Sequence, residues 1–166
     1  MDKEEKQRSY ERAQQLLAEQ NFAGAVIAGA VATLLGAFLY GVVVARIGIA
    51  YGFAAAGVGI VIGLAMQYVG RGIDMKFSIV ATVYTLIGCV LGNFFANIGL
   101  TPGHMDAAVD VLRRSSLPEL AERAVSGLSG THFVFWFVAV FAGVFFARRA
   151  LSRADRLALG VLELRE

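Results

Sequence analysis

The sequence predicts an all-α, polytopic membrane protein with four transmembrane helices and an amphipathic helical segment between helices 3 and 4. Composition is the first reason, because 57% of the 166 residues are hydrophobic and 17% are charged, whereas soluble domains carry about 25% charged residues. The charge is also segregated, since only Arg46, Arg71, Asp74 and Lys76 are charged between residues 22 and 100. A soluble fold would scatter charge over its surface, so the pattern indicates an integral membrane protein.

Three apolar runs reach the roughly 20 residues that a bilayer-spanning helix needs, and a fourth, shorter run from His132 to Ala147 can be extended by Thr131 and Ala150. They cover about 22–45, 49–70, 77–99 and 131–150, and together they define a transmembrane domain over 22–150. The tripeptide Arg46-Ile47-Gly48 separates the first two runs, which predicts a tight helical hairpin. Residues 1–21 are polar and helix-forming, and the first apolar run is too long for the hydrophobic region of a signal peptide.

The distribution of lysine and arginine predicts that both termini lie on the cytoplasmic side. Eleven of these residues fall on the side of the termini and of the 71–76 loop, and four fall on the opposite side. Cytoplasmic flanks carry the excess of positive charge, so this ratio favours that orientation. The eleven are Lys3, Lys6, Arg8, Arg12, Arg71, Lys76, Arg148, Arg149, Arg153, Arg156 and Arg165; the four are Arg46, Arg113, Arg114 and Arg123.

The segment at 104–127, between the third and fourth spans, reads as two short amphipathic helices. Thr101-Pro102-Gly103 breaks the chain before a first helix from Met105 to Arg114. Ser116 and Glu119 then fit a capping box for a second helix, which is expected to end near Ser126 before Gly127. The pair either caps the bundle as surface helices or lies in the outer membrane interface.

Small residues recur every three or four positions in the first three spans. That spacing places them on one helix face, and in lipid the close approach of backbones replaces the hydrophobic force that joins helices in water. The pattern predicts packing seams of the glycine-zipper kind, whose helix-packing residues are Gly29, Gly36, Gly52, Gly59, Gly63, Gly88 and Gly92. The seams serve either a core of spans one to three within one chain, or a homo-oligomer interface or narrow pore.

The fourth span differs from the other three because it is rich in phenylalanine. Phe133, Phe137, Phe141 and Phe145 fall close to one helix face. We expect that face to meet lipid or a partner rather than a tight core. Arg148 and Arg149 stop the span, and the tail at 151–166 is amphipathic, either resting on anionic lipid or exposing a solvated face.

Polar residues within the spans are few, and such residues are costly in lipid. Asn93 and Asn97 continue a line from Cys89 at four-residue steps, for which the two interpretations are interhelical hydrogen bonding or a permeation path. Gln67 and Arg71 stand at the inner end of the second span. There Arg71 is expected to reach the headgroups or to pair with Asp74, and Arg71, Arg148 and Arg149 are expected to anchor the interface.

The sequence offers no pattern of catalytic or metal-binding chemistry. It contains no GxSxG, HExxH, P-loop or CxxC motif and no pair of intramembrane carboxylates. His104 and His132 have only Asp106 close by in sequence, which is too few ligands for a metal or haem site. We therefore expect no enzyme activity, no cofactor and no metal, and the net charge of +2 is too small to indicate nucleic-acid binding.

A resemblance to a known group rests on residues 29–98. Gly29 and Gly36, then Tyr40, the stretch IAYGFAAAGVGIVIGLAMQYVGRGID and a third span ending LIGCVLGNFFANI resemble small uncharacterised bacterial four-span membrane proteins with a glycine-rich transmembrane hairpin. The resemblance covers roughly residues 22–150. It implies the cytoplasmic (inner) membrane of a bacterium, with a periplasmic location for 104–127, and it supplies no activity and no functional residues.

Two functions follow as hypotheses. The first is a non-enzymatic structural or accessory subunit that acts through helix–helix contacts with itself or with a larger membrane assembly, in contact with membrane lipid. The alternative is a small homo-oligomeric channel or transporter whose path runs along the third span and is lined by Gln67, Asn93 and Asn97.

Overall fold

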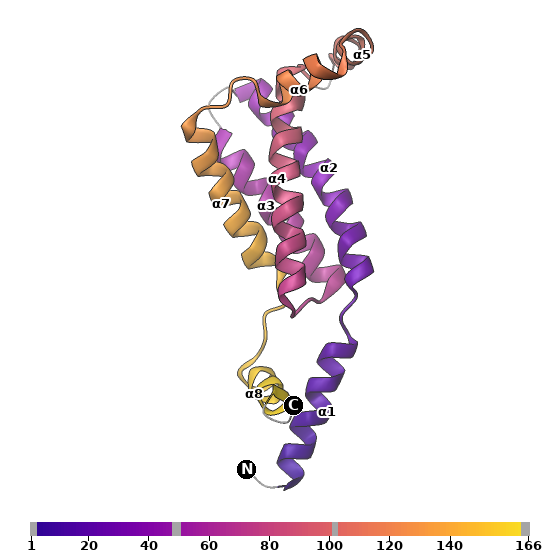
Figure 1. Ribbon diagram of the computed structural model, residues 1–166, viewed down its shortest axis with the longest axis vertical. Helices are drawn as coiled ribbons and strands as arrows, with labels where there is room; N and C mark the ends of the chain where they lie inside the picture. Colours follow the sequence, from indigo (N-terminus) through magenta and orange to yellow (C-terminus); the bar gives the residue numbers. More distant parts are fainter. Residues whose placement is uncertain (1–2, 48–50, 101–102, 164–166) are drawn as a thin grey trace.

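The computed structural model describes residues 3–47, 51–100 and 103–163, in which helices are joined by short turns and no strand is present. The elements are α1 (Lys3–Ala18), α2 (Phe22–Ile47), α3 (Tyr51–Gly70), α4 (Met75–Asn97), α5 (Met105–Arg114), α6 (Leu117–Val125), α7 (Gly130–Ala147) and α8 (Arg153–Glu163). Helices α2, α3, α4 and α7 form an elongated bundle, with α5 and α6 at one end and α1 and α8 beyond the other (Figure 1).

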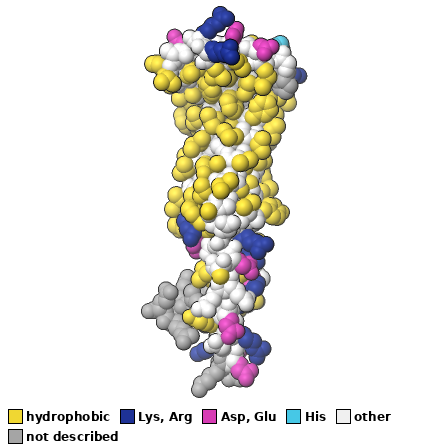
Figure 2. All heavy atoms as spheres, turned by 90° about the vertical axis from the view of Figure 1, so that its right-hand side faces the viewer, with side chains coloured by type: hydrophobic (Ala, Val, Ile, Leu, Met, Phe, Trp, Pro, Cys, Tyr) yellow, Lys and Arg dark blue, Asp and Glu magenta, His cyan; other side chains and the backbone are white. Residues whose placement is uncertain are grey.

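Four helices are long and apolar enough to cross a membrane, which identifies a multi-pass membrane protein as the sequence predicted. The qualifying segments are Phe22–Ile47, Phe53–Gly70, Met75–Asn97 and Gly130–Ala147. Figure 2 shows hydrophobic side chains covering the four-helix part, while charged side chains gather at its two ends. Lipid cannot hydrogen-bond to the backbone, so each span satisfies its own polar groups by remaining helical over its whole length.

The boundaries of the helices follow from local capping chemistry. The Asn21 side chain accepts a hydrogen bond from the Gly24 backbone N–H at 2.8 Å and so begins α2. The predicted capping box at Ser116 is present, with the Ser116 N–H donating to Glu119 at 2.9 Å, and Gly127 after α6 has φ +75°. The expected hairpin tripeptide ends at Gly48 and the expected break begins at Thr101, and both positions lie outside the described residues.

The closest helix packing is between α3 and α7. A Cβ at Gly59 would lie 2.8 Å from the carbonyl carbon of Ala139, and a Cβ at Gly63 would lie 2.7 Å from the carbonyl oxygen of Gly143. Of the two interpretations of the seams, these contacts match a core within one chain, but that core extends beyond spans one to three because α7 belongs to it. The overlooked signal is a line of small residues, Ala139, Gly143 and Ala147, which are buried at four-residue steps.

The other predicted glycines pack within the same chain. A Cβ at Gly29 would meet the Tyr84 ring at 2.7 Å, and one at Gly92 would meet the Tyr40 ring at 2.5 Å. A Cβ at Gly88 would meet Val58 at 2.8 Å, whereas Gly36 leaves ordinary space beside Val58 at 3.5 Å. Gly52 lies in the first turn of α3, but its surroundings fall outside the described part of the chain.

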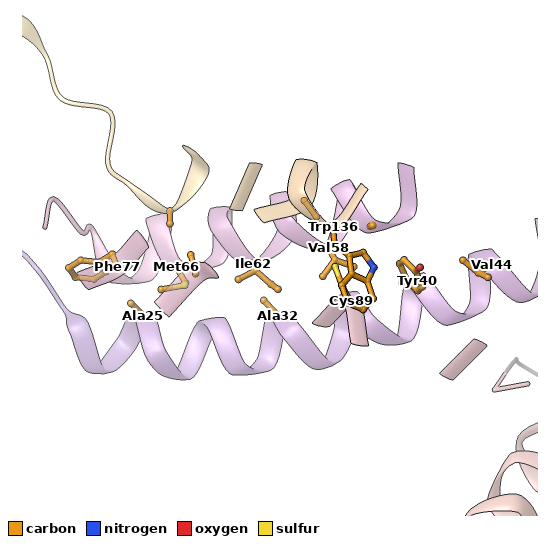
Figure 3. Close-up of a cluster of buried hydrophobic side chains, with 14 residues drawn as sticks. Ala25, Ala32, Tyr40, Val44, Val58, Ile62, Met66, Phe77, Cys89 and Trp136 are labelled. Atoms are coloured by element: carbon orange, nitrogen blue, oxygen red, sulfur yellow. The ribbon is translucent and has the colours of Figure 1, made fainter. Parts of the chain in front are cut away.

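A continuous row of buried side chains runs along the bundle axis. Figure 3 shows this row from Phe77 at one end, through Met66 and Ile62, to Tyr40 and Val44 near the other. Phe77, Met66 and Ile62 are fully buried. Large residues of one helix thus fill the space that the small residues of its neighbours leave open.

Helices α1 and α8 form a separate pair beyond the bundle. They pack against one another, and Ala13, Leu16 and Ala158 are buried between them. The Arg12 guanidinium donates to the Asp155 carboxylate at 2.9 Å, and this hydrogen bond, with a second one from Ser152, lowers the pKa of Asp155. The described part of the tail therefore covers α1, an arrangement that neither interpretation of the tail included.

Candidate functional site

The polar junction, defined as residues 19–21, 67–74 and 148–149, lies where the bundle meets the α1–α8 pair. The Glu19 carboxylate accepts a hydrogen bond from Arg149 at 2.6 Å and lies 3.8 Å from the Arg71 guanidinium. The bond from Arg149 is the main reason that the pKa of Glu19 is lowered. One carboxylate thus joins the ends of α1, α3 and α7.

Backbone hydrogen bonds hold the same three segments together. The Asn21 N–H donates to the Gly70 carbonyl at 2.8 Å, and the Arg149 N–H donates to the Gly72 carbonyl at 2.9 Å. The Ile73 N–H donates to the Gln20 side-chain oxygen at 3.2 Å. The turn between α3 and α4 is consequently fixed on two sides, by the chain that enters α2 and by the chain that leaves α7.

Gln67 and Arg148 add side-chain contacts at the membrane-facing part of the polar junction. The Gln67 amide donates to the Arg148 carbonyl oxygen at 2.8 Å, and the Arg148 Nε donates to the Ser78 hydroxyl at 2.6 Å. The structure therefore brings Gln67, Arg71, Arg148 and Arg149 to one end of the molecule. The predicted Arg71–Asp74 pair is not the one formed, because Asp74 binds Lys76 at 2.8 Å and Arg71 faces Glu19.

Arg71 has a left-handed backbone with φ +48°, the one non-glycine residue with positive φ in the described ranges. It follows the last residue of α3, and its N–H donates to the Gln67 carbonyl at 3.0 Å, which closes the final turn of that helix. This conformation costs a non-glycine residue roughly 1–2 kcal/mol. Glycine would adopt this helix-ending conformation more easily, but only a charged side chain such as that of Arg71 can also form the ion pair with Glu19.

An open groove of about 720 Å³ lies beside the polar junction, between α3, α7 and the start of α8. Its polar wall carries Gln67 and three arginines, and its apolar wall carries side chains of α3 and α7. The residues lining it are Leu64, Gln67, Ile73, Phe141, Val144, Phe145, Phe146, Arg148, Arg149, Ala150, Leu151 and Arg156. Such a volume lies within the roughly 300–1,000 Å³ that is typical of small-molecule pockets.

The second polar cluster is at the opposite end, where α4 meets α6. Asn93, which is buried, donates to the Ala124 carbonyl at 2.9 Å, and Asn97 donates to the Arg123 carbonyl at 2.8 Å. Both amides also donate to the Ser126 carbonyl, at 3.2 and 3.1 Å. Of the two interpretations of this line, the geometry matches interhelical hydrogen bonding, and α6 is tied to the bundle.

The described residues contain no group of three His, Cys, Asp or Glu side chains that could hold a metal ion. His104 precedes α5 without a side-chain capping hydrogen bond, while His132 Nδ1 lies 3.1 Å from the Ser129 N–H and helps to begin α7. Cys89 is buried as a free thiol. Neither histidine is thus part of a ligand cluster in the described ranges.

Several residues that build these sites carried no local signal in the sequence. Glu19 lies 130 positions from Arg149, and Ser78 lies 70 positions from Arg148, so only the folded chain brings them together. Arg156 was counted among the charges of the tail, yet it lines the groove beside α7. No protein-family model, curated protein or solved structure matches this chain.

Proposed function

We propose that this multi-pass membrane protein is a non-enzymatic structural or accessory subunit that offers a rigid helix face to a larger membrane assembly. The observation that carries the proposal is the two-sided character of α7. One side carries Ala139, Gly143 and Ala147, all buried against the bundle. The other side carries Phe133, Phe137, Phe141 and Phe145, which are 58%, 73%, 67% and 67% exposed.

The exposed face of α7, defined by those four phenylalanines, is well suited to a protein partner. Aromatic side chains are enriched at interface cores, because they offer a large contact area with few rotatable bonds to immobilise. Two of the rings are braced, since Phe133 packs edge-on against Trp136 at 5.7 Å and Phe145 against Phe146 at 5.2 Å. The contacts of Gly59 and Gly63 also support this face by holding α7 tightly on α3.

The proposal places the protein in the cytoplasmic membrane of a bacterium, with the α1–α8 end in the cytoplasm. Lysines and arginines predominate at that end, which matches the positive-inside rule. The basic groups of the polar junction then lie at the inner headgroup level, and α5 and α6 lie on the periplasmic side. Labelling of single cysteines, placed at Gln14 and at Asp106 after Cys89→Ala, with an impermeant thiol reagent tests this orientation.

The contacts of the polar residues and glycines do not favour the alternative, a homo-oligomeric channel along the third span. Its path would need the amide groups of Gln67, Asn93 and Asn97. Asn93 and Asn97 donate to carbonyl oxygens of α6, and Gln67 donates to the Arg148 carbonyl oxygen. Of the glycines predicted to form seams, those in the described part of the chain face neighbours within the same chain, namely Gly29, Gly36, Gly59, Gly63, Gly88 and Gly92. Self-association therefore enters only as an outcome of the experiment below.

The test combines site-specific cross-linking with native mass spectrometry of protein extracted gently from its host membrane. A photo-reactive phenylalanine analogue is placed at Phe137 on α7, and the matched control is Leu34 on α2, which is exposed to 58%. We expect a cross-link to one defined foreign membrane protein from position 137 alone. The same subunit must appear in the native complex at fixed stoichiometry and must be lost from Phe137→Ala but not from Leu34→Ala.

Three results would contradict the accessory function. One is a bare monomer with no protein cross-link from either position. Another is equal cross-linking from both positions, which would indicate collisions in the bilayer. The third is a cross-link only to a second copy of the chain, together with a closed homo-oligomer, which would revive the channel.

A further inference from the structure

We infer that the groove between α3, α7 and α8 is a binding site for one anionic phospholipid of the leaflet at the α1–α8 end. Its polar wall is cationic, since Arg148, Arg149 and Arg156 line it and no acidic residue does among the residues described. Its apolar wall is formed by side chains of α3 and α7, among them Leu64, Phe141 and Phe145. Lipid binding in this groove requires only that the chain crosses a membrane, and it does not require a protein partner at α7.

The charge balance of the groove favours an anion. Glu19 neutralises Arg149 through the 2.6 Å contact. Arg148 donates only its Nε to the uncharged Ser78 hydroxyl, so its positive charge has no carboxylate partner in the described ranges. Arg156 is exposed and, within the same ranges, forms no ion pair. Two guanidinium groups thus remain available for a phosphodiester, whose oxygens match their fork of donors.

The position of the groove along the bundle favours a lipid over a soluble anion. Arg148 directly follows the last residue of α7, so the cationic wall begins where the apolar span ends. Above it, Phe141 and Phe145 line the groove and are each 67% exposed, and Leu64 of α3 lines it as well. A phosphate held by the arginines would therefore leave the acyl chains against an apolar surface.

A second hollow on the other side of the polar junction shows what distinguishes the groove. That hollow, of about 580 Å³, is lined by Arg71 and Arg149, but also by the Glu19 carboxylate that faces both. It has no apolar wall comparable to the one formed by Leu64, Phe141 and Phe145. Both the hollow and the groove thus contain basic residues, but only in the groove do arginines without a carboxylate partner lie next to an apolar wall.

The experiment measures lipid retention by the intact protein. Wild type is reconstituted in vesicles of phosphatidylcholine mixed with phosphatidylglycerol, extracted with a mild detergent and weighed by native mass spectrometry. The variant is Arg156→Gln, which removes a groove guanidinium that makes no ion pair in the described residues. The matched control is Arg153→Gln, which removes the same charge from an exposed position of α8 that does not line the groove.

We expect wild type to retain phosphatidylglycerol in preference to phosphatidylcholine, with one tightly held molecule per chain. Arg156→Gln should lower that retention about five-fold, as expected for the loss of one arginine near anionic lipid, and Arg153→Gln should leave it unchanged. Equal loss in both variants would overturn the site, because it would reduce the effect to overall charge.

Two further outcomes would also overturn it. The first is retention of phosphatidylcholine as strong as that of phosphatidylglycerol. The second is retention of glycerol 3-phosphate, added to the wild type without lipid, that is as strong as the retention of phosphatidylglycerol. This result would identify a soluble anion site and remove the role of Leu64, Phe141 and Phe145.

Discussion

The contact of α3 with α7 can be tested by adding one methyl group at Gly59. In Gly59→Ala the new Cβ would lie 2.8 Å from the carbonyl carbon of Ala139 and 3.2 Å from its Cα, where ordinary contact begins at 3.4 Å. The obstacle is backbone, so no side-chain rotation relieves it. The two helices must therefore move apart locally by at least about 0.6 Å.

That displacement is enough to weaken the whole helix pair. A gap of 0.5–1 Å forfeits roughly a quarter to a half of each dispersion contact that it opens, and overpacking of a dense core typically costs about 1–3 kcal/mol. In lipid no hydrophobic force pulls the helices together again. Gly57→Ala is the matched control, because it lies in the same helix and its Cβ would meet nothing within 4 Å.

Both variants exchange glycine for alanine inside α3, so any gain in helix propensity cancels in their comparison. We expect Gly59→Ala to be less stable than Gly57→Ala by about 1–3 kcal/mol. The assay is unfolding in mixed micelles with a rising fraction of denaturing detergent, followed by the fluorescence of Trp136. It is the one tryptophan of the chain and is buried on α7. Equal midpoints, or a higher midpoint for Gly59→Ala, would refute the packing argument.

Three further predictions concern the polar contacts. Asn93→Leu should leave the Ala124 carbonyl of α6 without its side-chain donor, at a cost of about 1–3 kcal/mol. Hydrogen exchange of α6 should then accelerate roughly ten-fold or more, and unchanged exchange would contradict the anchoring role. Acidification should weaken the α1–α8 pair, because the pKa of Asp155 is lowered by its hydrogen bonds from Arg12 and Ser152. The stabilisation is present above the ordinary aspartate pKa and is lost as the pH falls through the lowered value. Spin-label distances between the two helices check this, and Arg12→Gln should reduce the pH dependence, whereas an unchanged dependence would contradict the role of Arg12. Arg71→Gly should relieve about 1 kcal/mol of backbone cost and lose the contact with Glu19. Because the two effects oppose one another, we expect the free energy of unfolding to change by less than about 1 kcal/mol. A larger loss of stability would show that the ion pair dominates.

The helices themselves were predictable because a bilayer leaves the backbone few choices. An apolar run in lipid must remain helical until a polar residue reaches the headgroups, so hydropathy alone located all four spans. The expected fourth span, 131–150, and the observed helix, Gly130–Ala147, differ by three residues at the end where Arg148 begins. Short helices were predictable for another reason, since the capping box of Ser116 is a local signal.

Partner choice among the helices was not predictable from periodicity. The phenylalanines of α7 dominate its composition and concealed the small residues Ala139 and Gly143 on the opposite side. A period of four shows which residues share a helix face, but it does not show which helix that face meets. The contact of Glu19 with Arg149 has no local pattern at all, because it depends on where α1 ends relative to α7.

The intramembrane amides share a chemical role that explains why they are amides. The last carbonyls of a helix have no partner within the helix, and they are costly when water is scarce. Gln67 supplies a donor to the carbonyl that follows α7, while Asn93 and Asn97 supply donors to the carbonyls at the end of α6. A carboxylate would repel those oxygens, and an ammonium group would bring an unpaired charge into the membrane. A neutral NH₂ group avoids both costs, so helix termination in a neighbouring element accounts for Gln67, Asn93 and Asn97.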